Sequence, residues 1–258
     1  MAHPAYIAGA IFDIDETLLD NQPEKGNPFS NLHQLARLDA LRVVGATRPE
    51  LGQLLEIGPQ ENYDSFIQSP VHTAPGAFHT LLQKRGILTD SDGVDHPLIQ
   101  SLIKHKNSAY AKLVATSGRP VAGADTFVRD LAERHELDRR LAIASSATYA
   151  DISTFLTTWN LADLFPDTRI ISGSDVAHPK PHPEAFNRAF ASLGLPEDAR
   201  RAVIALEDDP RGMLSARQAG LYVCGITTRY TRQQLEQIEA KPDLIVDSYA
   251  ELRDAFGV

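Results

Sequence analysis

Residues 8–18 read AGAIFDIDETL, in which a short apolar run leads directly into two aspartates, Asp13 and Asp15. Short apolar runs of this kind are typical of strands buried in a parallel sheet, so residues 6–12 are predicted to form a strand. Ligands of open parallel sheets bind just beyond the carboxyl ends of the strands, where both aspartates lie. With i, i+2 spacing their side chains leave the strand on the same side, provided that the extended geometry continues that far.

Two neighbouring carboxylates suit either of two kinds of chemistry. One carboxylate can act as a nucleophile while the other donates or accepts a proton. The pair also attracts a divalent cation, and Mg²⁺ prefers hard oxygen ligands. The alternative is that Asp13 and Asp15 are solvated acids of a loop, and the D-x-D pattern alone does not separate these interpretations.

Strands and helices are predicted to alternate in the second half of the chain. Such alternation is typical of βαβ units and of a parallel sheet covered on both faces. Further apolar runs predict strands at 141–144, 169–172, 202–206, 222–226 and 244–246. Helical patterns lie between them at 124–137, 149–160, 183–193, 210–219 and 232–240.

The alternation is interrupted after the first strand by a long helical insertion. Leucines and a valine recur every third residue between Leu32 and Val44, which predicts a helix face, and helical patterns continue at 51–57, 77–84 and 97–113. No strand pattern occurs between 32 and 114. The fold class predicted is therefore α/β, a Rossmann-like doubly wound parallel sheet core with an inserted, mostly α-helical domain. The expected core comprises 1–20 and 117–258, and the expected insertion comprises 21–116.

Composition excludes several classes of protein. The 258 residues include 25 Lys and Arg against 34 Asp and Glu, a net charge of −9, which disfavours binding to nucleic acid or to an anionic membrane. The single cysteine, Cys224, excludes an internal disulfide framework and is expected to be buried in a strand. No stretch approaches the roughly 20 apolar residues of a membrane span, and no secretory signal is recognisable, so a soluble cytoplasmic protein is expected.

Polar residues that can bind a phosphate occur at two further places, one at a strand end and one before a helix. Ser145 and Ser146 end the strand at 141–144, where hydroxyl and backbone N–H groups can bind a phosphate oxygen; a helix N-cap is the simpler interpretation of a serine pair. Lys180 lies between two prolines just before a predicted helix, where it can pair with a phosphate and with a carboxylate. The alternative for Lys180 is a solvated side chain.

Three consecutive acids, Glu207, Asp208 and Asp209, end the strand at 202–206. Clustered carboxylates at a strand end are costly unless they bind a cation or cap the following helix. Both interpretations apply to this stretch, because a helix is predicted to begin near Pro210.

Four segments, in this order, resemble motifs of the haloacid dehalogenase superfamily of hydrolases. The likeness covers residues 6–18 and 120–250 and is greatest to subfamily I, which includes phosphatases and β-phosphoglucomutase-like enzymes with a type-one helical cap. The insertion lies where that cap lies. The segments are FDIDETLLD (12–20), IASSA (143–147), HPKPHPEAF (178–186) and IALEDDPRGMLSARQAG (204–220).

The resemblance implies a role for each matching residue. Asp13 resembles the nucleophile that forms an aspartyl-phosphate, and Asp15 resembles the general acid and base. Ser145, together with Ser146, resembles the phosphate-binding group, and Lys180 resembles the lysine that contacts both phosphate and nucleophile. The presence of Asp15 favours phosphate chemistry over carbon–halogen chemistry, because dehalogenating members lack this acid.

The resemblance also implies a Mg²⁺ cofactor. Its ligands would be Asp13, the backbone carbonyl of Asp15, Asp208 and Glu207. The function expected is a Mg²⁺-dependent phosphatase that removes phosphate from a small phosphorylated metabolite. A phosphomutase is the closest alternative, and a non-catalytic binding protein on the same fold is a further one. The sequence identifies neither the substrate nor the oligomeric state.

Several other residues are open to more than one interpretation. Many relatives have glycine where this chain has Glu16, so the turn there is expected to adopt an ordinary L-residue conformation. His33 either faces a cleft or packs within the cap. His178 and His182 form a conceivable zinc pair, although the prolines beside them already account for the local sequence. Arg37 and the other cap arginines either bind a substrate anion or are solvated helix charges.

Overall fold

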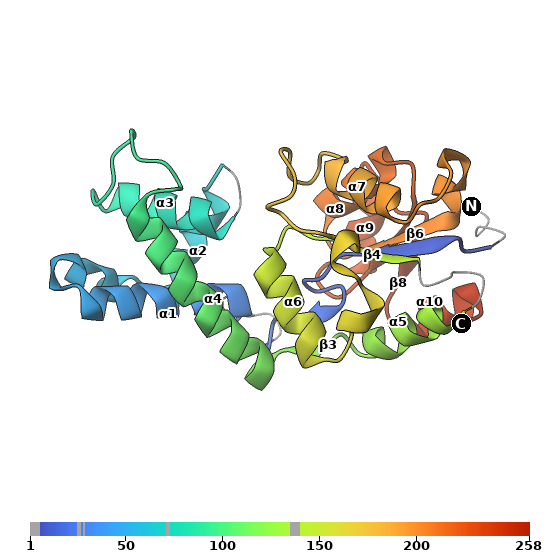
Figure 1. The fold of residues 1–258 in the computed structure, drawn as a ribbon, viewed down its shortest axis with the longest axis horizontal. Helices are drawn as coiled ribbons and strands as arrows, with labels where there is room; N and C mark the ends of the chain where they lie inside the picture. The colour runs from blue at the N-terminus through green and yellow to red at the C-terminus, as the bar shows by residue number, and fades with distance from the viewer. Residues whose placement is uncertain (1–5, 25–26, 28, 71–72, 135–139) are drawn as a thin grey trace. The chain divides into compact units, whose positions relative to one another are not determined.

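The computed structural model describes residues 6–24, 27, 29–70, 73–134 and 140–258. The chain divides into two compact units (Figure 1). One unit combines Met1–Asp20 with Arg119–Val258, and the other is Asn21–Gly118. The first strand and the C-terminal half therefore belong to one compact unit, and the segment between them forms the other.

A six-stranded parallel sheet forms the centre of the first unit, which confirms the predicted α/β class. Its strand order is β5-β4-β1-β6-β7-β8, so β1 lies between two strands that come much later in the chain. The strands are β1 Gly9–Phe12, β4 Leu141–Ala144, β5 Ile170–Ile171, β6 Val203–Glu207, β7 Tyr222–Ile226 and β8 Leu244–Val246. A short antiparallel pair, β2 Leu19–Asp20 with β3 Arg119–Pro120, was not predicted.

Helices cover both faces of this sheet, with α7 and α8 on one side and α5 and α10 on the other (Figure 1). The α-helices are α5 Ala124–Glu133, α6 Tyr149–Thr158, α7 Glu184–Ser192, α8 Pro210–Gln218, α9 Arg232–Gln237 and α10 Tyr249–Phe256. The 3₁₀ helices are η3 Ala162–Leu164, η4 Asp167–Arg169 and η5 Glu197–Ala202. The end of the predicted helix 124–137 falls partly outside the described residues.

Apolar side chains fix the sheet between these helices. Ile11 and Ala205 on the strands pack in one buried cluster with Phe186 of α7 and Met213 of α8. On the other face, the ring of Phe127 in α5 lies 5.4 Å from the ring of Tyr249 in α10. Burial of such side chains contributes about 1.5–3 kcal/mol each, which holds the strand ends in a fixed register.

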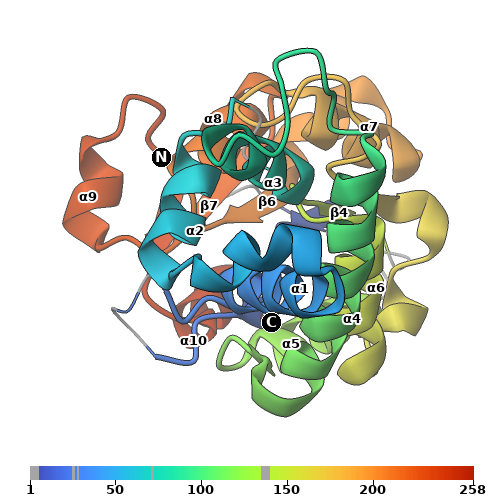
Figure 2. The ribbon, with the colours of Figure 1, turned by 90° about the vertical axis from the view of Figure 1, so that its left-hand side faces the viewer.

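The second unit is helical, and none of its described residues lies in a strand. Figure 2 shows α1, α2, α3 and α4 of this unit. Leu38, Leu41 and Val44 of α1 are buried with Leu98 and Leu102 of α4, as the spacing of apolar residues in α1 predicts. The elements are α1 Leu32–Thr47, the 3₁₀ helix η1 Pro49–Glu56, α2 Pro59–Ile67, α3 Ala74–Lys84 and α4 Pro97–Ser117. In the described part of the chain, every helix is too short or too polar to span a bilayer.

Candidate active site

The carboxyl ends of β1 and β6 bring Asp13 next to the acidic stretch after residue 206. Phe12 pairs with Leu206 in the parallel ladder, and the backbone N–H of Asp13 donates to the carbonyl of Leu206 over 3.1 Å. This register places Asp13 level with Glu207 and Asp208, although nearly 200 residues separate them in the sequence. The strand-end rule therefore accounts for the meeting of these carboxylates.

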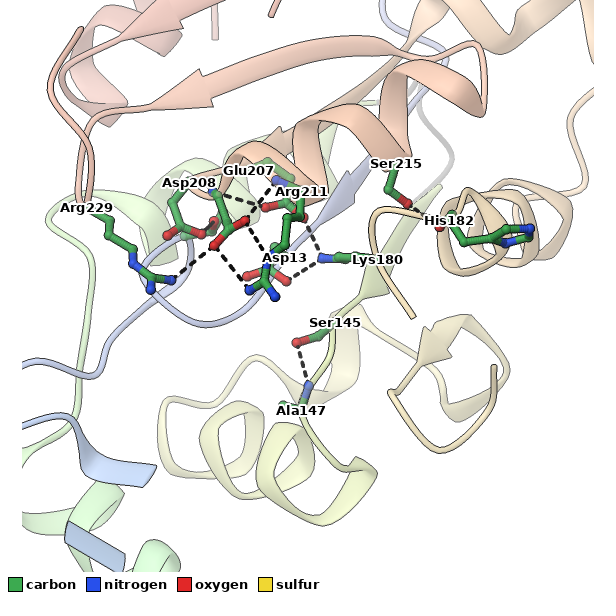
Figure 3. A network of polar contacts seen from close by, with 12 residues as sticks. Asp13, Ser145, Ala147, Lys180, His182, Glu207, Asp208, Arg211, Ser215 and Arg229 are labelled. Carbon is green, nitrogen blue, oxygen red and sulfur yellow. Dashed lines mark hydrogen bonds and ion pairs between the residues drawn. The ribbon is translucent and has the colours of Figure 1, made fainter. Parts of the chain in front are cut away.

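Lys180 lies between two of these carboxylates (Figure 3). Its Nζ donates to Oδ1 of Asp13 over 2.7 Å and to Oε1 of Glu207 over 2.5 Å. The Lys180 side chain is only 8% exposed, and its ammonium lies 5.1 Å from the centre of the Phe186 ring. Such a buried, fully paired ammonium is held in one position, so the alternative of a solvated lysine is wrong.

Three buried carboxylates gather within reach of one metal ion. One oxygen each of Asp13, Glu207 and Asp208 lies within 4.8 Å of the others. Oδ1 of Asp208 accepts a hydrogen bond from Thr17 over 3.3 Å, whereas Oδ2 is buried without a partner. An unpaired buried carboxylate oxygen costs free energy unless a cation binds it, so this donor set fits Mg²⁺.

The pKa values of the three carboxyl groups are raised, first by burial and then by repulsion from neighbouring carboxylates. Burial raises the pKa of Asp13, and the Lys180 ammonium offsets only part of that rise. Burial also raises the pKa of Glu207 to about 8 and that of Asp208 well above its usual value. For Lys180 burial acts in the opposite direction, yet attraction to Asp13 and Glu207 raises its pKa. One buried ammonium does not neutralise three carboxylates, and a divalent cation would complete the balance.

Helix α8 holds the Glu207 carboxylate by passing very close to it. A Cβ atom built on Gly212 would lie 2.0 Å from Oε1 and 2.3 Å from Oε2 of Glu207. Only glycine leaves room for the carboxylate at this distance. The neighbouring Asp209 has a different role, because its side chain accepts a hydrogen bond from the Arg211 N–H and caps α8.

Ser145 and Ser146 lie at the end of β4, but their environments differ. Ser145 is buried, and its Oγ accepts a hydrogen bond from the Ala147 N–H over 3.2 Å (Figure 3). Ser146 is exposed. Thr148, rather than either serine, caps the following helix, so the N-cap interpretation of the pair is wrong. The hydroxyl and N–H groups at this strand end are the kind that bind phosphate oxygens.

Asp15 is half-buried and close enough to Asp13 for its charge to raise the pKa of Asp13. The next residue, Glu16, was expected to adopt an ordinary L-residue conformation, and this expectation is wrong. Its φ is 61°, in the left-handed region. The backbone N–H groups of Thr17, Leu18 and Leu19 all donate to the carbonyl of Ile14, which closes a turn that demands this conformation. The turn therefore overrides the preference of an L-residue, at a cost of about 1–3 kcal/mol.

Three residues of the site were missed in the sequence. Thr17 donates to Asp208, and the hydroxyl of Tyr249 donates to the Thr17 carbonyl over 2.9 Å. Arg229 lies near Asp208 and forms a 3.2 Å ion pair with Asp209. Only Thr17 could have been found from the sequence, since it lies two residues after Asp15. Tyr249 and Arg229 lie far from the motifs in the sequence, and only the folded structure brings them to the site.

The structure also tests the sequence-based interpretations of Cys224 and Arg37, which lie outside the carboxylate cluster. Cys224 is buried in β7, as expected, and burial raises the pKa of its thiol. Arg37 is 2% exposed and is therefore not a solvated helix charge. Its Nε donates to Asn62 over 3.3 Å, its Nη2 is buried without a partner, and burial lowers its pKa to about 10.

The chain is similar to a known protein family and to several known proteins. A family model described as haloacid dehalogenase-like hydrolase matches residues 50–226. Protein CbbY of Rhodobacter capsulatus is 36% identical over 138 residues, which are 52% of this chain and 57% of that protein. Probable phosphatase IndB of Dickeya dadantii (strain 3937) is 36% identical over 114 residues, which are 43% of this chain and 46% of that protein. The chain thus matches about half the length of these curated relatives.

A solved structure has the same fold over nearly the whole chain. The structure of CbbY from Rhodobacter sphaeroides in complex with phosphate superposes with a TM-score of 0.68 at 20% sequence identity. The match covers 98% of this chain and all of the other. At this identity the likeness concerns the fold, and the chemistry must be argued from the residues of this chain.

Proposed function

Because the chain belongs to the haloacid dehalogenase-like hydrolase family, we propose that it is a Mg²⁺-dependent phosphatase of a small phosphorylated metabolite. The observation that carries this proposal is the 2.7 Å contact between Lys180 Nζ and Asp13 Oδ1, inside a cluster of three buried carboxylates. A paired carboxylate at a strand end suits a nucleophile, and the surplus negative charge suits a divalent cation. A relative named as a probable phosphatase supports the same activity.

The first chemical step is a transfer of the phosphoryl group to Asp13. An oxygen of the Asp13 carboxylate attacks phosphorus, so that a bond forms between this oxygen and phosphorus while the P–O bond to the leaving group breaks. Asp15 gives its proton to the leaving alkoxide, which departs as an alcohol. Lys180 and the hydroxyl and N–H groups near Ser145 hold the equatorial phosphate oxygens, whose charge they offset during the transfer.

The second step returns Asp13 to its starting state. Asp15, now a carboxylate, takes a proton from a water molecule as that water attacks phosphorus. The P–O bond to Asp13 breaks, inorganic phosphate leaves, and both carboxyl groups regain their initial protonation. Dividing the hydrolysis in this way replaces one difficult displacement by two easier ones.

The carboxylates of Asp13, Glu207 and Asp208, with the backbone carbonyl of Asp15, would hold the Mg²⁺. When bound, the ion supplies positive charge that stabilises the transferring phosphoryl group. Glu207 also holds Lys180, so the same carboxylate fixes both positive charges of the site. The unit Asn21–Gly118 corresponds in this proposal to the cap that selects the substrate.

A panel of phosphorylated metabolites, assayed for phosphate release, tests the activity. Release should require Mg²⁺, stop in excess chelator and return when Mg²⁺ is restored. A sugar 1-phosphate belongs in the panel, because conversion to the 6-phosphate without free phosphate would identify a phosphomutase instead. Full activity in chelator would contradict the proposed role of the metal.

A pair of matched variants tests the metal ligands. Asp208→Asn should weaken Mg²⁺ binding at least tenfold, since it removes a negative charge from a hard-cation site. Asp209→Asn is the control: it removes the same charge one residue away, and asparagine still caps a helix. Mg²⁺ titration of phosphate release by both variants measures the difference. Equal Mg²⁺ requirements would contradict the assignment of Asp208.

A further inference from the structure

The segment that carries Lys180 contains a second group of metal-ligating side chains, apart from the carboxylate cluster. It consists of His178, His182 and Glu184, each of which offers one ligand atom within 4.8 Å of the other two. The two imidazole rings lie 4.5 Å apart, and the ring of His182 points away from the carboxylate cluster (Figure 3). The group is therefore distinct from the proposed Mg²⁺ site.

Glu184 is held in a defined orientation at the centre of this group. Its Oε1 accepts from the Ala177 N–H over 3.2 Å and from Arg188 over 2.6 Å. Its Oε2 accepts from the His178 N–H over 3.0 Å. These bonds fix the orientation of both carboxylate oxygens, one of which faces His178.

The distances suit coordination of one ion. Metal–ligand bonds of about 2.0–2.2 Å in a tetrahedral site put neighbouring ligand atoms about 3.4 Å apart. Nδ1 of His178 lies 3.1 Å from Oε2 of Glu184, close to that spacing. Nδ1 of His182 accepts the Glu184 N–H over 3.3 Å, so this nitrogen is unprotonated and would exchange that hydrogen bond for a bond to the ion. The exposed imidazoles can rotate to close the remaining distance.

The type of ligand distinguishes this site from the carboxylate cluster. Two imidazoles and one carboxylate suit Zn²⁺ and related transition metals, whereas Mg²⁺ prefers oxygen ligands alone. We propose that His178, His182 and Glu184 form a binding site for a zinc-class transition metal. Such an ion would bridge both ends of the segment 178–184, between which Lys180 reaches Asp13 and Glu207. It would brace the segment that positions the lysine. This site does not depend on the proposed phosphatase activity.

Calorimetric titration with Zn²⁺, on chelator-treated full-length protein in excess Mg²⁺, tests the site. The excess Mg²⁺ competes with Zn²⁺ for the carboxylate cluster, and Asp208→Asn removes a carboxylate of that cluster, so a Zn²⁺ site that this variant retains lies elsewhere. We expect one saturable Zn²⁺ site per chain that Asp208→Asn retains. His178→Ala and His182→Ala should each weaken binding at least about tenfold, while His105→Ala, a histidine of α4 outside the group, should not. Co²⁺ bound at the same site should show the visible absorption of a tetrahedral nitrogen and oxygen environment.

Thermal unfolding provides a second measurement, since an ion that binds only the folded chain raises its Tm. Zn²⁺ should raise the Tm of the wild-type protein and of His105→Ala but not of His182→Ala. A Kd weaker than about 100 μM would overturn the proposal. Zn²⁺ binding that is unchanged in His178→Ala and in His182→Ala, when both variants are folded, would also overturn the proposal.

Discussion

Replacement of Gly212 by alanine tests how the fold holds the Glu207 carboxylate. The added Cβ would lie 2.0 Å from Oε1 of Glu207, and real Cβ contacts essentially never fall below 3.0 Å. The carboxylate must therefore move by about 1 Å or more, or α8 must shift. Since Oε1 accepts from Lys180 over 2.5 Å, a movement of the carboxylate stretches that ion pair, whereas a shift of α8 disturbs the packing of this helix against β6 and β7.

We expect Gly212→Ala to lower the free energy of unfolding by about 2–4 kcal/mol. Overpacking costs about 1–3 kcal/mol and loss of a buried ion-pair partner about 3–5, and relaxation of the helix recovers part of both. Urea unfolding of Gly212→Ala and of Gly52→Ala measures the effect. Gly52 is a suitable control because a Cβ there meets nothing within 4 Å. If both variants unfold at the same urea concentration and Gly212→Ala keeps wild-type turnover, the close approach does not hold Glu207.

Three other perturbations follow from the structure. Glu16→Gly should be about 1 kcal/mol more stable than Glu16→Ala in urea unfolding, because only glycine adopts φ of 61° without strain; equal stabilities would contradict this. In chelator, the free energy of unfolding should fall as pH rises from 4.5 to about 8. Burial raises the pKa of Glu207 to about 8 from 4.5, so the folded state binds more protons within that window. Mg²⁺ should reduce this fall, and stability that rises with pH would refute it. Arg37→Met should be at least as stable as the wild type in thermal unfolding, because it removes a buried charge that no carboxylate of the described residues pairs with. A large loss of stability would show that the Asn62 hydrogen bond and the Phe66 ring, whose centre lies 4.9 Å from the guanidinium, compensate for the buried charge.

The predicted strands were found because burial on both faces leaves a direct record in the sequence. Runs such as 141–144 and 222–226 are apolar throughout, as strands inside a two-sided sheet must be. Helix α2 was missed for the opposite reason. Its buried residues are Asn62 and Ser65, and Asn62 donates to the Gln34 carbonyl over 3.1 Å, so polar bonds rather than apolar periodicity fix this helix.

Site residues could be predicted from the sequence where they lie directly after a predicted strand. Asp13 and Asp208 meet this condition, since the sheet brings the ends of its strands to one edge. Lys180 lies in the segment before α7, and its place in the site was indicated by the prolines beside it and by the motif resemblance. Tyr249 contacts Thr17 across 232 residues, and nothing near either residue indicates that pairing. Glu16 shows the limit of a local rule, because three N–H groups that converge on Ile14 decide its backbone conformation.

The identity of the phosphorylated residue tests the central claim most directly. Asp15→Asn keeps the nucleophile but removes the proton shuttle, which typically costs about 10²–10⁴-fold in rate. With p-nitrophenyl phosphate, whose leaving group needs little protonation, hydrolysis should slow more than transfer, and the phosphoenzyme should accumulate. Mass spectrometry of the quenched protein should then find phosphate on Asp13, and none in Asp13→Asn. Phosphate on any other residue, or turnover by an Asp13→Asn enzyme free of deamidation, would contradict the assignment.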